Sequence, residues 1–104
     1  TCVRDYLHVL DLADAHIKGL NFLSNSNDKY EVFNIGLGMG ISVLELIDIF
    51  QETNQIFFDY KISSRRKGDS AISFADNSRA LSTLKWEPKY NYKDMCRDSW
   101  NSSK

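Results

Sequence analysis

The chain has 104 residues, of which 42% are hydrophobic and 12% aromatic, and it contains a single proline. A chain of this length forms one domain or part of one, and its composition supports a packed core and excludes a disordered tail. Thirteen Lys and Arg residues oppose fourteen Asp and Glu residues, so the formal net charge is -1. This balance excludes the global basic field that drives non-specific nucleic-acid binding, so any cationic site must be local.

The cysteines and the amino terminus bear on the compartment. Cys2 and Cys96 lie at opposite ends of the chain without a C-x-x-C motif, and His8 and His16 are not grouped with them, so we expect no zinc site. Two free thiols are typical of a reducing, cytoplasmic environment. The sequence contains no run of 18 apolar residues and no signal-peptide pattern, so we expect no membrane partner. The chain opens with Thr1 rather than Met, which suggests a fragment or a processed piece.

The first predicted elements are a helix over 9–23 and a strand over 30–36. Asp11 can cap the helix, whose apolar residues follow the i, i+3, i+4 spacing from Leu12 to Leu23. The segment "YEVFNIG" at 30–36 is rich in aromatic and β-branched residues, which is typical of a buried strand.

A second helix and strand follow. Ser42 and Glu45 form an S-x-x-E capping box at the start of a predicted helix over 41–53. The segment "IFFDYKI" at 56–62 alternates strictly, which predicts a strand with one face more buried than the other.

The last third of the sequence predicts three short elements. These are a strand over 71–75, a helix over 78–84 that ends near Trp86, and a helix over 92–100 capped by Asn91. The expected fold class is therefore α/β, a mixed α+β lobe of about four helices with short strands in one compact unit.

The glycine-rich segment "GLGMG" at 36–40 joins the predicted strand to the second helix. Backbone amides at such a turn can bind a phosphate, as in dinucleotide-binding folds. The spacing is G-x-G-x-G rather than G-x-G-x-x-G, and Asp59 lies inside its predicted strand rather than at the end of one. We favour a tight strand-to-helix turn over a dinucleotide site, although such a turn can still line a ligand pocket.

A local cluster of charge, "RRKGD" at 65–69, follows the predicted strand over 56–62. Arg65 and Arg66 offer planar forks that match phosphate oxygens two at a time, and Asp69 can accept two hydrogen bonds from a sugar diol. The alternative is a polar turn whose charges serve solubility, and on this segment alone we favour that alternative.

Five ordered motifs change that balance. "VRDYLHVLDLAD" resembles the V-R-D-Y-I-H-V-x-D-L-A-D segment of UDP-glucose 4-epimerases, which are extended short-chain dehydrogenase/reductase enzymes. "VFNIGLGMGISVLEL", "RRKGD", "FADNSRALSTLKW" and "YKDMCRDSWNS" resemble later segments of the same family in the same order. The resemblance covers the whole chain but only the carboxy-terminal third of such an enzyme. It implies that residues 1–104 are a carboxy-terminal UDP-sugar-binding domain without the amino-terminal Rossmann domain.

The resemblance implies six substrate-binding residues: Arg4, Tyr6, Val43, Arg66, Asp69 and Ser73. The family's counterparts of the two arginines contact the UDP phosphates, and the aspartate of R-R-x-G-D holds the ribose. Tyr6 and Val43 match positions on the uridine side. Ser73 falls where the family varies between a bulky aromatic and a small residue beside the hexose, so its small volume suggests room for an N-acetyl group. Lys67 departs from the family, where an acid is common.

The resemblance also implies what other parts of the enzyme supply. In the family, a tightly held NAD takes hydride from C4 of the hexose, and the tyrosine of a Tyr-x-x-x-Lys pair takes the hydroxyl proton. None of the five tyrosines here has a lysine four positions later. We therefore expect no catalytic residue in this chain, no epimerase activity from it alone, and an intact enzyme that interconverts UDP-galactose and UDP-glucose as a cytoplasmic homodimer.

Other functions remain open at this point. They are the corresponding lobe of a nucleotide-sugar dehydratase, decarboxylase or uronate epimerase, a non-catalytic nucleotide-binding module, and nucleic-acid binding through "RRK", which the net charge disfavours. We also expect packed or surface histidines, tryptophans that anchor a core or a domain interface, and some exposed apolar surface, since such a lobe packs against another domain.

Overall fold

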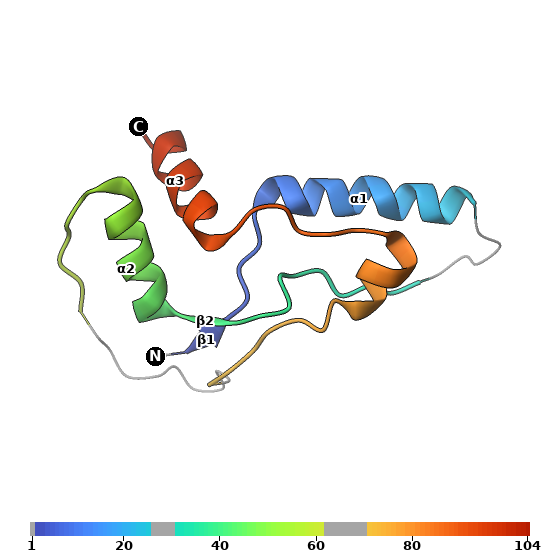
Figure 1. Cartoon of the computed structure of the whole chain (residues 1–104), viewed down its shortest axis with the longest axis horizontal. Coiled ribbons are helices and arrows are strands. Elements are labelled where there is room, and N and C mark those ends of the chain that lie inside the picture. The colour runs from blue at the N-terminus through green and yellow to red at the C-terminus, as the bar shows by residue number, and fades with distance from the viewer. Residues whose placement is uncertain (1, 26–30, 62–70) are drawn as a thin grey trace.

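A computed structural model describes residues 2–25, 31–61 and 71–104. It contains three α-helices, α1 (Val9–Ser24), α2 (Val43–Asn54) and α3 (Tyr92–Ser102), a π-helical turn η1 (Ala80–Leu84), and two short strands, β1 (Val3–Arg4) and β2 (Ile41–Ser42). Figure 1 shows α2 and α3 together at one end of the molecule and α1 extending toward the other. The predicted mixed α/β class with four helical elements and short strands is confirmed.

Helix α1 is confirmed, but its predicted cap is wrong. His8 occupies the N-cap, where its Nδ1 accepts a hydrogen bond from the Leu10 N–H at 3.0 Å. Asp11 lies inside the first turn, and its carboxylate accepts from the backbone N–H groups of Lys89 and Tyr90 at 3.0 and 3.1 Å. The aspartate therefore ties α1 to the segment before α3, a long-range role that the local sequence does not indicate.

Helices α2 and α3 both begin with complete capping boxes. Ser42 and Glu45 form the predicted one, and Asn91 pairs with Asp94 in the same way. Such boxes satisfy donors at the helix start that have no partner inside the helix. The two helices pack through aromatic rings, with Phe50 meeting Trp100 edge to face at 5.9 Å.

The strands predicted over 30–36 and 56–62 are wrong within the described residues, and the strand predicted over 71–75 is reduced to one bridge. Residues 31–35 and 56–61 are extended but belong to no strand, and residues 71–75 contribute a single parallel bridge, between Ile72 and Val3. A strand needs a neighbour with which to exchange hydrogen bonds, and an alternating sequence does not supply one. The predicted helix over 78–84 is confirmed, with π-helical bonding over Ala80–Leu84.

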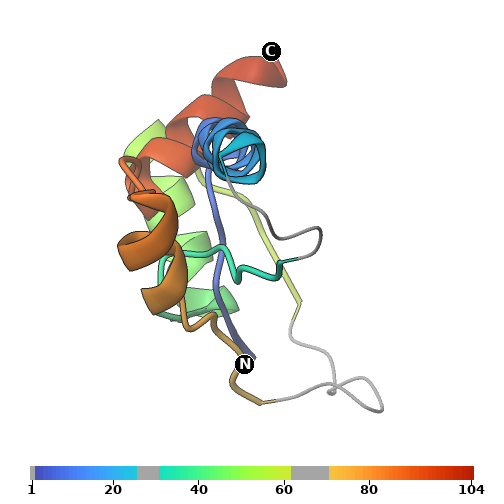
Figure 2. The ribbon, with the colours of Figure 1, turned by 90° about the vertical axis from the view of Figure 1, so that its right-hand side faces the viewer.

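The core is small, and the molecule measures 52 × 33 × 19 Å along its principal axes; Figure 2 views it along α1. Ala15, Ala80, Leu84 and Trp86 are buried together, and the Trp86 indole N–H donates to the Asp11 carbonyl oxygen at 2.9 Å. The Cα radius of gyration is 16.4 Å, against about 13 Å for a compact domain of this length.

Large apolar side chains are exposed on α1 and on the extended segments. Those with more than half of their surface exposed are Val9, Leu10, Ile17, Leu20, Val32, Met39, Phe57, Ile72 and Phe74. This confirms the expected exposed apolar surface, which is more than a folded lobe normally presents to water.

Candidate functional site

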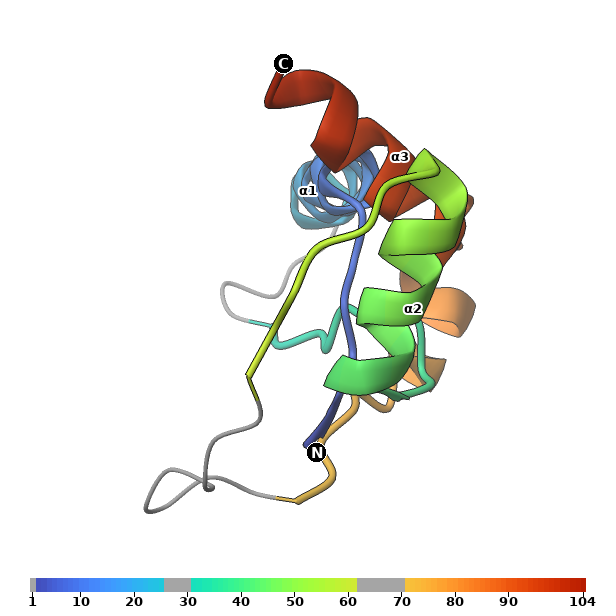
Figure 3. The ribbon, with the colours of Figure 1, turned by 90° about the vertical axis from the view of Figure 1, so that its left-hand side faces the viewer.

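Strand β1 brings together segments that are far apart in the sequence. It pairs antiparallel with β2, with Arg4 opposite Ile41. On its other edge, the Val3 N–H donates to the Ala71 carbonyl oxygen at 2.8 Å, and the Ser73 N–H donates to the Val3 carbonyl oxygen at 2.9 Å. Figure 3 shows this meeting point at the foot of α2. The strand therefore holds the start of α2 and the segment around Ser73 on either side of Arg4.

Three of the six predicted site residues, Arg4, Val43 and Ser73, lie in this region, and Arg66 and Asp69 lie outside the described residues. Val43 is the first residue of α2, and its N–H donates to the Cys2 carbonyl oxygen at 3.2 Å, so it lies beside β1. Arg4 and Ser73 line one surface hollow of about 530 Å³. One guanidinium nitrogen of Arg4, Nη1, donates to the Val3 carbonyl oxygen at 2.9 Å. The hollow thus places a cation and a small hydroxyl, groups that a sugar phosphate can use, beside the carboxylates of Asp5 and Asp76.

Tyr6 lies in a different hollow from Arg4 and Ser73. It lines an apolar groove of about 650 Å³ together with Leu46 and Phe50 of α2 and with residues of α3. Its ring meets Tyr92 edge to face at 6.3 Å, and the Tyr92 hydroxyl donates to the Met39 carbonyl oxygen at 2.9 Å. The described residues thus gather Arg4, Ser73 and Val43 around β1 but direct Tyr6 to the neighbouring groove.

The glycine turn at 36–40 binds a carboxylate of the chain itself. The Leu37 N–H donates to Asp5 Oδ1 at 2.9 Å, and the Gly38 N–H donates to Asp5 Oδ2 at 3.0 Å. The same carboxylate accepts a third bond, from the Ala75 N–H at 3.2 Å. Because these amides already have an acceptor within the chain, the glycines form a tight turn before α2, although the segment that precedes the turn is not the predicted strand.

Close contacts explain why glycines occupy this turn. A Cβ at Gly36 would lie 2.6 Å from Asp5 Oδ2 and 2.8 Å from the Ala75 Cβ, both too close for real atoms. Gly38 has a φ of +81°, in the left-handed region that favours glycine. The turn is therefore shaped around Asp5, whose contribution sequence analysis missed because the two motifs are more than thirty residues apart.

Comparison with known proteins shows which enzymes this chain is similar to. No protein-family model matches the chain. The chain is 46% identical over 100 residues to a UDP-glucose 4-epimerase of Dictyostelium discoideum and 43% identical over 100 residues to that of Bacillus subtilis. These alignments cover 96% of this chain and 29% of each enzyme. The chain matches the carboxy-terminal part of UDP-glucose 4-epimerases.

Part of each of several solved epimerases has the same fold as this chain. The Stenotrophomonas maltophila UDP-glucose 4-epimerase, with bound NAD and formylated UDP-arabinopyranose, gives a TM-score of 0.91 at 46% identity, covering 97% of this chain and 30% of its own. The Bifidobacterium longum epimerase, in complex with NAD+ and UDP, gives 0.85 at 37% identity, covering 99% and 31%. The UDP-Glc/GlcNAc 4-epimerase of Campylobacter jejuni gives 0.84 at 32% identity, covering 97% and 30%. The chain thus spans less than a third of the length of these extended short-chain dehydrogenase/reductase enzymes.

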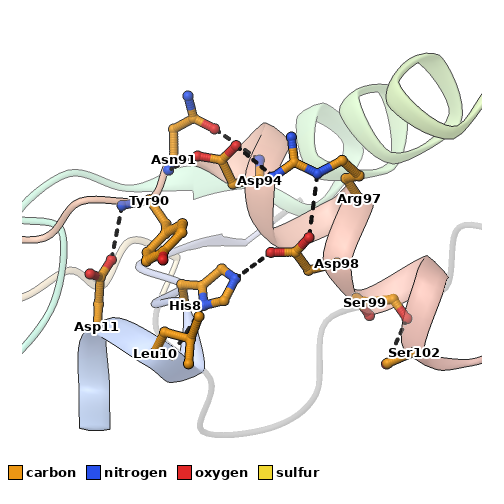
Figure 4. Close-up of polar contacts among 10 residues, drawn as sticks. All are labelled: His8, Leu10, Asp11, Tyr90, Asn91, Asp94, Arg97, Asp98, Ser99 and Ser102. Carbon is orange, nitrogen blue, oxygen red and sulfur yellow. Dashed lines mark hydrogen bonds and ion pairs between the residues drawn. The ribbon is translucent and has the colours of Figure 1, made fainter. Parts of the chain in front are cut away.

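The buried histidine of this epimerase-like chain is structural. Figure 4 shows His8 between Leu10, Tyr90 and Asp98. Its Nδ1 accepts from the Leu10 N–H, so its proton lies on Nε2, which donates to Asp98 Oδ2 at 2.8 Å. The Tyr90 ring stacks on the imidazole at 4.3 Å. Both ring nitrogens are engaged, so His8 is a packed histidine, as expected, and within the described residues no cluster of metal-binding side chains occurs.

Proposed function

We propose that the chain is the carboxy-terminal UDP-sugar-binding domain, residues 1–104, of a UDP-glucose 4-epimerase that interconverts UDP-galactose and UDP-glucose. One observation carries the proposal: the match to epimerases extends over 96% of the chain at up to 46% identity. The hollow that contains Arg4 and Ser73 supports it, because it offers a cation and a hydroxyl to a sugar phosphate.

The proposal assigns a role to each of the six predicted residues. The two arginines, Arg4 and Arg66, bind the UDP phosphates, and Asp69 binds the ribose hydroxyls. Val43 and Tyr6 line the uridine side. The position of Arg4 in the hollow supports its role, whereas the roles of Arg66 and Asp69 rest on the R-R-x-G-D motif.

The cofactor NAD belongs to another part of the enzyme in this proposal. Solved epimerases of Stenotrophomonas and Bifidobacterium contain NAD. In this chain the amides of Leu37 and Gly38 donate to Asp5, so the glycine turn does not fit a dinucleotide. NAD supplies the hydride chemistry at C4 when it is bound, and this chain holds the nucleotide sugar. The chain by itself therefore has no epimerase activity and binds NAD negligibly.

The pathway, compartment and oligomeric state of the intact enzyme are part of the same proposal. An enzyme that interconverts these sugars serves galactose metabolism in the cytoplasm and works as a homodimer, with this domain packed against its own NAD-binding domain. The exposed apolar side chains of α1 support a partner surface. In the described part of the chain, no helix is long and apolar enough to span a bilayer.

The sugar pocket is proposed to accept N-acetylhexosamines as well as hexoses. Ser73 lines the hollow beside Arg4, and a serine leaves more volume there than an aromatic side chain would. The solved relative from Campylobacter jejuni is a UDP-Glc/GlcNAc 4-epimerase, which supports dual specificity within this fold.

A chimaera tests the proposed function. In this chimaera the chain replaces the matching 29% of the Bacillus subtilis epimerase. We expect it to convert UDP-galactose to UDP-glucose, and we expect Arg4→Ala to raise KM on the order of 10-fold, since a charge-assisted bond to phosphate is lost. A folded chimaera that binds NAD but not UDP would contradict the proposal. The control Lys104→Ala, at an exposed terminus, should leave KM unchanged.

A further inference from the structure

We propose that Asp5 is a positioning residue for UDP binding, which sets the main chain around Arg4 without touching the substrate. This inference rests on the proposed function, because it concerns how the phosphate-binding arginine is held. Nothing in the motif resemblance assigns a role to Asp5.

The first support is the number and origin of its hydrogen bonds. The carboxylate accepts from Leu37 and Gly38 in the glycine turn and from Ala75, two residues beyond Ser73, at 2.9 to 3.2 Å. Asp5 directly follows Arg4, so one side chain joins the strand of the arginine to both neighbouring segments. A carboxylate with several backbone N–H donors is held in a fixed position.

The second support is the shape of the turn. Gly36 approaches Asp5 Oδ2 so closely that a Cβ would lie 2.6 Å away. The Asn77 side chain donates to the Gly36 carbonyl oxygen at 2.8 Å, and Tyr92 donates to the Met39 carbonyl oxygen at 2.9 Å. Together with the bonds from Leu37 and Gly38 to Asp5, these contacts hold each residue from Gly36 to Met39, so the turn cannot shift without loss of some of them.

Electrostatics and positioning predict opposite results for this residue. Asp5 and Arg4 line the same hollow. An aspartate near a phosphate site repels the phosphate, so removing its charge should strengthen UDP binding if Coulomb repulsion is its main effect. If Asp5 instead holds Arg4 in place, the same change weakens UDP binding. Asp5→Asn separates the two, because the amide keeps the shape but replaces one of the two accepting oxygens by an NH2 group, which cannot accept from a backbone N–H.

The experiment measures UDP and uridine binding by titration on the chain and on the chimaera. We expect Asp5→Asn to weaken UDP binding on the order of 10-fold and uridine binding by less than about 3-fold, since only UDP has phosphates for Arg4. In the chimaera, KM should rise while kcat changes less. In an Arg4→Ala background, Asp5→Asn should weaken UDP binding by less than about 3-fold, because coupled residues are not additive.

Asp11→Asn is the matched control. Its carboxylate also accepts from two backbone N–H groups, those of Lys89 and Tyr90, but it does not line the hollow. It should lower the melting temperature and leave UDP affinity unchanged. Gly36→Ala provides a second variant that disturbs the same turn if Asp5→Asn fails to fold.

The outcomes separate the two proposals. If the wild-type chimaera binds UDP and the folded Asp5→Asn form binds it as well or better, the role of Asp5 is wrong and the proposed function stands. If Asp5→Asn and Asp11→Asn lose equal affinity, Asp5 is merely structural. If the wild-type chimaera binds NAD but not UDP, the proposed function fails, and the role of Asp5 fails with it.

Discussion

His8 and Asp98 join the two ends of the chain through a hydrogen bond of 2.8 Å between residues ninety positions apart. The same imidazole caps α1 through Nδ1, so a single side chain starts one helix and fixes its position against another. With only 6% of its surface exposed, His8 has little water available to replace either bond. The arrangement of α1 relative to α3 therefore depends on this residue.

We expect His8→Ala to lower the free energy of unfolding by about 2 to 4 kcal/mol, because the helix cap, the bond to Asp98 and the ring stacking on Tyr90 are lost together. His8→Asn should recover about 1 kcal/mol, since asparagine is a good N-cap. Urea unfolding followed by circular dichroism measures both. His16→Ala is the control: His16 is exposed on the same helix, and its substitution should cost less than about 0.5 kcal/mol. Equal losses from the two histidine variants would contradict the role of His8.

The helices were predictable because their signals are local. The capping box of Ser42 and Glu45 and the cap at Asn91 each depend on residues three positions apart, and both are confirmed. The strand predictions failed, because an alternating sequence such as "IFFDYKI" forms a strand only where a neighbouring strand completes the hydrogen-bond ladder.

The candidate site likewise contains residues that motifs predict and residues whose roles depend on long-range contacts. Motif order selected Arg4 and Ser73, and the structure brings them to one hollow. The contact of Asp5 with the glycine turn could not be read from the sequence, because it joins two motifs that carry no mark of their pairing. Asp11 was assigned to a cap because it stands at a helix start, but a long-range contact with Lys89 and Tyr90 determines its role.

The pKa of Asp98 should lie below its ordinary value of 3.8, because of the hydrogen bond from His8 and, secondarily, the guanidinium of Arg97. A carboxyl whose folded pKa is lowered contributes stability above its unfolded pKa and loses that contribution as the pH falls through the folded value. Carbon-13 titration of the carboxyl measures the shift. In His8→Ala the pKa of Asp98 should return toward its ordinary value; an unchanged midpoint would show that His8 is not the main cause.

The two cysteines should differ in reactivity, and both are free thiols. Burial raises the pKa of the Cys96 thiol, and only 4% of its surface is exposed, so little thiolate is available for attack. Cys2 is partly exposed in the folded chain. We expect iodoacetamide at pH 8 to modify Cys2 at least about 10-fold faster than Cys96, with the difference abolished in urea. Mass spectrometry of the timed reaction measures both rates, and equal rates in the folded chain would contradict the burial of Cys96.

Ser73→Tyr should narrow the sugar specificity of the chimaera. Ser73 lines the hollow that contains Arg4, and its backbone N–H is bonded to the Val3 carbonyl oxygen, so a larger side chain at this position is expected to reduce the volume of the hollow. We expect turnover of UDP-N-acetylglucosamine to fall on the order of 100-fold while turnover of UDP-glucose changes less than about 3-fold, because only the acetylated sugar needs the lost volume. Ser73→Ala is the control and should keep both activities, since it preserves the space. Equal losses for the two sugars in Ser73→Tyr would mean that the side chain at this position blocks the common nucleotide path, and would remove the argument that its volume selects the hexose.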